Sequence, residues 1–177
     1  MYKPDSLRAT LLASVPQLKH DHERLLMFID QGSVRCTAAA SLSYEYAYSL
    51  QIILTDFPGS PDAVMLPLLG WLREHQSELL ANLDKVDKGI EFEVDILDKS
   101  KVDMAITLQL TERVVVKRLE DGTYSVTHAP EPQYEAYENY GPMQFIANGE
   151  LLTEWTPPPA PDAMALVTPH PRRPSDG

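Results

Sequence analysis

The stretch IEFEVDI at residues 90–96 is followed by the turn DKSK at 98–101 and then by VDMAITLQL at 102–110. In both runs apolar residues alternate with polar ones, a period of two that is typical of a strand with one buried face. Two such runs joined by a short polar turn predict an antiparallel hairpin with one face in water. The fold is therefore expected to contain an antiparallel sheet covered on one side.

Further strands are predicted on both sides of this hairpin. Residues 33–57 should form two strands, because apolar residues occupy the even positions from Tyr44 to Leu54. Extended chain at 114–119 turns at 120–122 into another strand at 123–127. The pair Asn148-Gly149 between two apolar runs predicts a C-terminal hairpin, since Asn-Gly suits a tight hairpin turn.

Two main helices are expected to cover the sheet. Asp5 and Ser6 are candidate N-caps for the first, and Pro16 should end or kink it. The second carries an apolar stripe that includes Trp71, which we assign to the core. Because proline is unfavourable inside a helix, we place the regular start of this helix near Pro67. The predicted class is α+β, a mostly antiparallel sheet packed against two main helices.

Chain length and proline content predict the domain organisation. A chain of 177 residues suits one domain, which we place at residues 1–155 with a Pro/Tyr-rich arm at 128–142. Residues 156–177 contain seven prolines and almost no periodicity. Such a composition predicts a disordered Pro-rich tail.

The charge balance limits the kinds of partner. With 26 acidic and 15 basic residues, the net charge is -11. Phosphate backbones and anionic membrane surfaces are bound through clustered Lys and Arg, so we expect neither specific nucleic acid binding nor membrane binding. No signal peptide pattern is visible at Met1–Asp5, and we expect the protein to stay in the cytosol or in something assembled there. Cys36 is the lone cysteine, and we expect a buried, inert thiol.

Four carboxylates form the main candidate site on the predicted hairpin. Glu91, Glu93, Asp95 and Asp103 fall on its polar face. Carboxylates grouped in this way can bind a divalent cation or perform acid–base chemistry. Nearby lysines can neutralise the row, so we interpret it as a solvated outer face. An acidic interface or channel lining is the alternative interpretation.

Other catalytic or metal-binding patterns are weak. His20 and His22 are two residues apart, a spacing that does not place them together on a helix, and no second ligand pair follows. The chain has neither a Gly-x-Ser-x-Gly elbow nor a phosphate-binding glycine loop. We predict no catalytic residue, no metal and no cofactor, and a small acidic hydrolase is only a minor alternative.

A group of tyrosines forms the candidate interface. These residues lie in or near the Pro-rich arm, and their amphipathic rings suit contacts between subunits. They are Tyr124, Tyr134, Tyr137 and Tyr140.

Several longer segments are more specific than any of these patterns. They are KPDSLR (3–8), LMFIDQGS (26–33), LSYE (42–45), ILTDF (53–57), WLREHQ (71–76), LQLTER (108–113) and IANGEL (146–151). In this order, across residues 1 to about 155, the chain resembles the tail completion protein R (GpR) family of contractile-tailed temperate phages. The Tyr-rich stretch at 133–140 and the tail after Trp155 depart from the family pattern.

The resemblance implies a structural, non-enzymatic virion protein of the tail that is assembled in the host cytoplasm. It would finish the head-proximal end of a contractile tail and permit head–tail joining. By analogy with tail terminators, α+β subunits that form rings, it implies a homo-oligomeric ring, expected to be a hexamer. Its further partners would be tail tube proteins, with sheath proteins as an additional candidate, and the connector or neck proteins of the head. The alternative is a transient tail-assembly factor that is absent from the mature virion.

Overall fold

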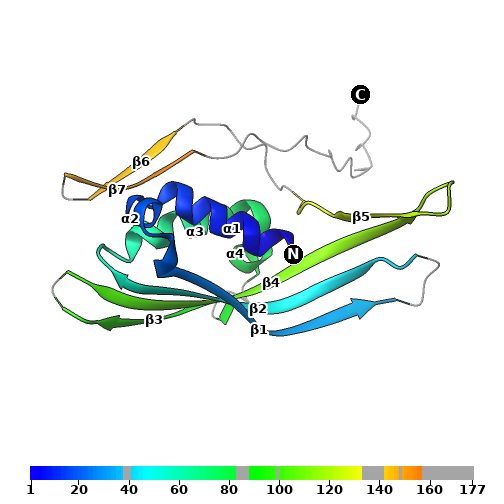
Figure 1. Cartoon of the computed structure of the whole chain (residues 1–177), viewed down its shortest axis with the longest axis horizontal. Coiled ribbons are helices and arrows are strands. Elements are labelled where there is room, and N and C mark those ends of the chain that lie inside the picture. Colours follow the sequence, from blue (N-terminus) through cyan, green and yellow to red (C-terminus); the bar gives the residue numbers. More distant parts are fainter. Residues whose placement is uncertain (38–40, 83–87, 99, 133–141, 148, 157–177) are drawn as a thin grey trace, which may run out of the picture.

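The computed structural model describes residues 1–37, 41–82, 88–98, 100–132, 142–147 and 149–156. The helices, in chain order, are α1 (Tyr2–Ser14), α2 (Pro16–His20), the 3-10 helix η1 (His22–Arg24), α3 (Asp62–His75) and α4 (Glu78–Ala81). The strands are β1 (Leu25–Cys36), β2 (Tyr44–Phe57), β3 (Ile90–Ile96), β4 (Val102–Arg118), β5 (Tyr124–His128), β6 (Met143–Ala147) and β7 (Glu150–Trp155). The fold is α+β, as predicted (Figure 1).

A five-stranded antiparallel sheet forms the base of the molecule. Its strand order is β1-β2-β4-β3, and β5 also pairs with β4. β2 pairs with β4 from Val102 to Val114. On the other side of β4, β3 pairs with Val102–Leu108 and β5 with Val114–Arg118. Because β2 and β5 both pair with Val114, they lie on opposite sides of β4. β3 and β5 therefore share one edge of the sheet, and β1 forms the other.

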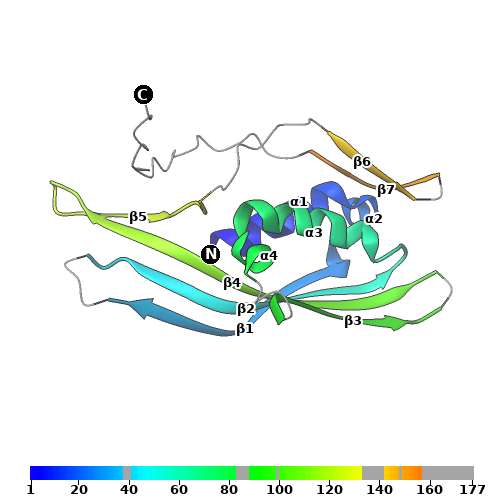
Figure 2. The same ribbon diagram turned by 180° about the vertical axis from the view of Figure 1, so that it is seen from behind.

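The helices α1 and α3 lie side by side on one face of this sheet (Figures 1 and 2). Alternate residues of β2 and β4 point toward the helices and are fully buried, as the period of two predicted. Trp71 of α3 is only 1% exposed, so its predicted place in the core is confirmed. Tyr48 on β2 is also buried.

The prediction that the second main helix starts near Pro67 is wrong. α3 begins at Asp62 and continues through this proline, which is itself buried in the core. A proline inside a helix removes one backbone hydrogen bond. Val64, Leu68 and Leu72 of the same helix are completely buried, and this burial outweighs the lost bond.

The first long strand also differs from its prediction. We expected two strands within residues 33–57, with the first beginning at residue 33. β1 instead runs from Leu25 through Gly32 to Cys36, with a bulge at Asp30 that lets pairing continue on both sides. Cys36 at its end is exposed, so the expected buried thiol is wrong. This end of β1 lies at the edge of the sheet, beyond the N-terminal end of α1 (Figure 1).

The predicted C-terminal hairpin is present as β6 and β7. It lies on the side of the helices opposite the main sheet (Figures 1 and 2). Thr153 on β7 is buried and donates its hydroxyl to the Ser14 carbonyl at 2.7 Å, and Trp155 contacts α3 at Gly70. Most of the predicted arm (133–141) and of the Pro-rich tail (157–177) lies outside the described residues.

Candidate functional site

The four predicted carboxylates do lie on one face of the sheet. Asp95 pairs directly with Asp103 across the hairpin, and Glu93 and Glu91 follow at alternate positions of β3. The buried positions of β4 alternate with these, so the carboxylates are on the face away from α1 and α3. Glu91, Glu93 and Asp95 are exposed. In the part of the chain that the structure describes, no group of three or more His, Cys, Asp or Glu could hold a metal ion.

One of these four carboxylates has a local structural role. Asp103 accepts a hydrogen bond from the backbone N–H of Asp56 at 2.7 Å. Asp56 has a positive φ of 50° at the end of β2, where the β2–β4 register shifts. Asp103 therefore stabilises an unfavourable backbone conformation at this strand end.

One of the four predicted interface tyrosines can be placed. Tyr124 lies on β5 and is 55% exposed, beside the equally exposed Val126 on the same face. Tyr134, Tyr137 and Tyr140 lie outside the described residues. Whether the four form an interface stays a prediction.

The most connected polar residue in the structure is Glu112 on β4. Its side chain is 2% exposed and accepts the N–H groups of Tyr2 and Lys3 at 3.0 and 3.1 Å. It also accepts the Tyr48 hydroxyl at 2.5 Å, and its Oε2 lies 2.8 Å from Nδ1 of His128. The carboxylate thus binds the N-terminus of α1, where free N–H groups and the helix dipole favour a negative charge.

This contact corrects the predicted start of the first helix. α1 begins at Tyr2 after Met1, and neither Asp5 nor Ser6 is its N-cap. The acceptor that the first N–H groups need comes from a strand about 110 positions further along the chain.

The electrostatics of Glu112 favour the charged form. Burial by itself raises the pKa of this carboxyl, but the Tyr48 hydroxyl, the two α1 N–H groups and the nearby His128 together outweigh burial. The net effect is a lowered pKa. Burial, with Glu112 beside the hydroxyl, raises the pKa of Tyr48. The pair therefore consists of a stable carboxylate and a stable neutral phenol.

A second group of polar contacts continues from Glu112 to the gap between β3 and β5. Lys3 Nζ lies 2.7 Å from Gln76 Oε1 and 2.6 Å from Glu131 Oε1, and burial lowers the pKa of this ammonium despite Glu131. Gln76 accepts the Thr111 N–H at 3.1 Å and donates to its hydroxyl at 3.2 Å. The Gln76 side chain thus occupies the β4 edge where neither β3 nor β5 pairs.

These contacts connect α1, α3, β2, β4 and the start of the predicted arm. Glu112 is not among the site residues that the sequence patterns predicted. A signal was nevertheless present, because residue 112 continues the buried alternation of Ile106, Leu108 and Leu110. An acidic residue at a core position needs charged or hydrogen-bonding partners, and those partners could not be identified from sequence.

A serine–histidine contact lies between α1 and α3. Ser6 Oγ is 3.5 Å from Nε2 of His75, whose Nδ1 is 3.1 Å from the Trp71 carbonyl. The Trp71 indole donates to Ser6 Oγ at 3.1 Å, and its ring stacks on the imidazole at 4.6 Å. Burial lowers the pKa of His75. These contacts position the two helices, and they lack the carboxylate that orients the base in a serine triad.

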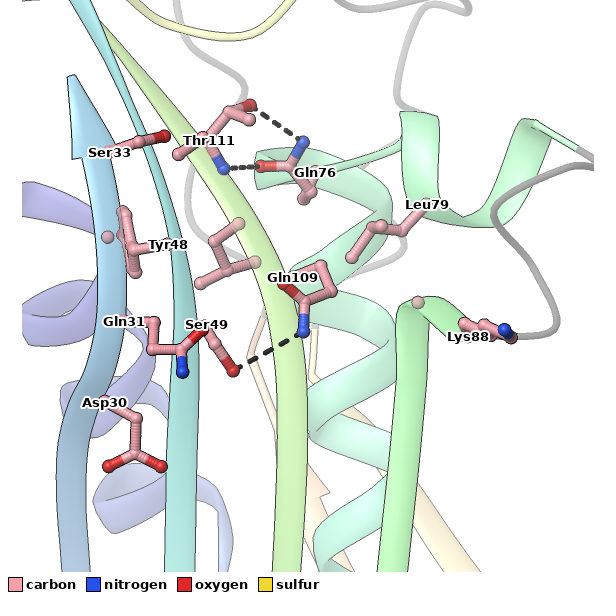
Figure 3. Close-up of a pocket in the computed structure, with 14 residues that line it drawn as sticks. Asp30, Gln31, Ser33, Tyr48, Ser49, Gln76, Leu79, Lys88, Gln109 and Thr111 are labelled. Atoms are coloured by element: carbon pink, nitrogen blue, oxygen red, sulfur yellow. Dashed lines mark hydrogen bonds between the residues drawn. The ribbon is translucent and has the colours of Figure 1, made fainter.

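A polar hollow of about 810 Å³ opens beside the start of β3, at Lys88 and Gly89 (Figure 3). Its lining combines amides and hydroxyls from β1, β2, β4 and the segment after α3. Gln109 donates to Ser49 Oγ at 3.4 Å across it, and Asp30 and Lys88 are its charged lining residues. The lining groups can hydrogen bond to a polypeptide, and they include no serine–histidine or cysteine–histidine pair.

The geometry therefore defines an α+β protein whose buried polar groups hold its own elements together and whose open surfaces are sheet edges and a polar hollow. No helix among the described residues is both long and apolar enough to cross a membrane.

Comparison with known proteins identifies the family. The chain belongs to the family described as P2 phage tail completion protein R (GpR), whose model matches residues 1–132. The Tail completion protein R of Escherichia phage P2 is 41% identical over 155 residues, which cover 88% of this chain and 99% of that protein. The resemblance found in the sequence segments is thereby confirmed. No solved structure matches the chain.

Proposed function

We propose that this protein completes the head-proximal end of a contractile phage tail and so permits a filled head to join. The observation that carries the proposal is its 41% identity to the Tail completion protein R of phage P2 over almost the whole of that protein. A shared tail completion role requires no catalysis, and the buried polar groups described above have structural partners.

The proposal includes assembly into a homo-oligomeric ring, expected to be a hexamer, that is a component of the virion. In this arrangement one side of the ring contacts tail tube proteins, with sheath proteins as a further candidate, and the other contacts connector or neck proteins. Two features support an assembly role. Among the described residues the outer edges of β1 and β3 pair with no strand, and the polar hollow presents amide and hydroxyl groups to a protein partner.

The role can be tested with a phage that carries a nonsense mutation in this gene. We expect electron micrographs of the lysate to show filled heads and separate tails, and purified protein added to the lysate should restore joined particles. Joined, infectious particles in the absence of the protein would contradict tail completion.

The same phage distinguishes a virion component from a transient assembly factor. Mass spectrometry of density-purified wild-type particles should detect the chain at a fixed ratio to the tail tube protein. Detection in the lysate alone, with none in purified particles, would show that the protein leaves before the virion matures.

A further inference from the structure

The edge strand β1 is the most exposed regular element of the fold. Within the described residues it pairs with β2 on one side, and no strand pairs with it on the other. Its apolar side chains are exposed on both faces, including Phe28 (49%), Ile29 (42%) and Val34 (61%). A long apolar edge strand is a template for pairing with another chain, and soluble proteins usually protect such edges.

The opposite edge shows the same feature at β3. Phe92 is 62% exposed and Ile96 is 79% exposed, both on the face that carries the helices. Two exposed apolar edges on one sheet are unusual for a protein that remains monomeric, because each one leaves apolar surface and unpaired backbone groups in water.

Apolar rows cross the sheet and end at both of these edges. One row runs through Met27, Ile52, Ile106 and Phe92, and the next runs through Ile29, Leu50, Leu108 and Ile90. The members on β2 and β4 are fully buried, whereas Phe92 and Ile29 at the ends of their rows are exposed. A second sheet placed against either edge would continue these rows and bury their ends.

Strand direction permits this continuation. Neighbouring strands along β1-β2-β4-β3 are antiparallel, so β1 and β3 run in opposite directions. When identical copies repeat by rotation, β1 of one copy lies antiparallel to β3 of the next. Contacts between two different edges are head-to-tail contacts, which produce a closed ring when the rotation closes.

We propose that copies of this chain join edge to edge, with β1 of one protomer paired antiparallel with β3 of the next, so that one sheet continues around the ring. This inference rests on the proposed ring and assigns its interface. The partner is a second copy of the chain, because the two edges fit each other. Both expose apolar side chains on the face that carries the helices, and β1 and β3 run in opposite directions. Phe92 of one protomer then packs beside Met27 and Ile29 of its neighbour.

Disulfide cross-linking tests the pairing directly. Cys36 is the lone cysteine, so C36S gives a cysteine-free background. In this background we expect I29C combined with F92C, V94C or I96C to give a ladder of covalent multimers under mild oxidation, because at least one pair should meet across the interface. The samples are the full chain in solution and completed tails from the complemented mutant phage. I29C alone should remain uncross-linked.

A strong dimer from I29C alone would overturn the proposal in favour of two-fold pairing of β1 with itself. The proposal would also be overturned if all three double variants still formed non-covalent multimers but none of them formed a disulfide between protomers. If neither purified protein nor completed tails contain any multimer, the ring itself fails. Tail completion is read separately, from joined particles in the complementation assay.

Charged substitutions provide an independent test. F92K and I29K each place an ammonium group at one edge, and we expect loss of the multimer with an unchanged monomer melting temperature. The matched control is I146K on β6, where Ile146 is 63% exposed and lies away from both edges. Equal multimer formation by all three variants would contradict the assignment.

Discussion

At the scale of single residues, Glu112 shows how one side chain connects distant parts of the chain. Its carboxylate binds the first N–H groups of α1, the Tyr48 hydroxyl and His128. A hydrogen bond to a buried charge contributes more than a neutral one, and removing the charge leaves its donors without a partner.

We expect Glu112→Gln to destabilise the protein by about 3 kcal/mol at pH 7, because an amide offers one acceptor where the carboxylate offers two. The pKa of Glu112 is lowered on folding, so its stabilisation is complete above the unfolded pKa and is lost as pH falls through the folded pKa. The stability difference between wild type and variant should therefore narrow from pH 7 to pH 3 in urea denaturation.

The control for this prediction is Glu93→Gln, which neutralises an exposed carboxylate on β3. Its stability difference from wild type should be small at every pH. A Glu112→Gln difference that stays constant, or widens, as pH falls would contradict the assigned pKa direction.

Trp71 is a second residue whose role can be tested alone. Its ring is buried and its indole donates to Ser6 at 3.1 Å. Trp71→Ala should cost about 3–5 kcal/mol, the usual loss for a buried aromatic side chain. Leu69→Ala, on the exposed side of the same helix, should cost less than about 1 kcal/mol. Equal melting temperatures for the two variants would place Trp71 outside the core.

At the scale of elements, close contact between α3 and the C-terminal hairpin fixes where the hairpin lies. A Cβ at Gly70 would lie 2.9 Å from ring atoms of Trp155, so only a glycine permits this approach. The hairpin alone would be marginal, because two strands rarely fold without a surface to pack on.

Gly70→Ala should displace the hairpin. Alanine favours the helix by about 1 kcal/mol, but the added methyl group collides with the Trp155 ring. With Trp71→Phe as background, Trp155 is the lone tryptophan, and we expect its fluorescence to shift to longer wavelength as it becomes exposed. Leu69→Ala in the same background is the control. An unshifted emission together with higher stability would show that the hairpin does not depend on this contact.

At the scale of the whole molecule, the described residues already enclose a continuous core. A chain that ends at Thr156 should therefore melt within about 2 °C of the full chain, since 1 kcal/mol corresponds to about 2–4 °C for a protein of this size. Calorimetry measures this directly. A much lower melting temperature would mean that residues 157–177 pack on their own domain.

The same truncation tests whether the Pro-rich tail takes part in assembly. Weaker ring formation with an unchanged melting temperature would identify residues 157–177 as an arm that binds a neighbouring subunit. Unchanged ring formation would identify them as dispensable for assembly. In the full chain, the bond between Arg172 and Arg173 is the first expected trypsin site, since a segment this rich in proline has little apolar surface to bury.

The sequence by itself determined the α+β class, the β3–β4 hairpin with its carboxylates on one face, the break at Pro16 and the burial of Trp71. Each depends on a period of two or 3.6, or on a proline, and such signals act between residues that are close along the chain. The longer family-specific segments also identified the family.

Only the tertiary structure decided where α1 begins, how β1 continues through Gly32, why α3 tolerates Pro67 and which edge of β4 receives β5. It also assembled the contacts of Glu112 and Gln76, which join residues up to 110 positions apart. The reason is that tertiary packing and long-range hydrogen bonds outweigh local propensity where they conflict. Which distant residues meet is not written in a pattern between residues that are close along the chain.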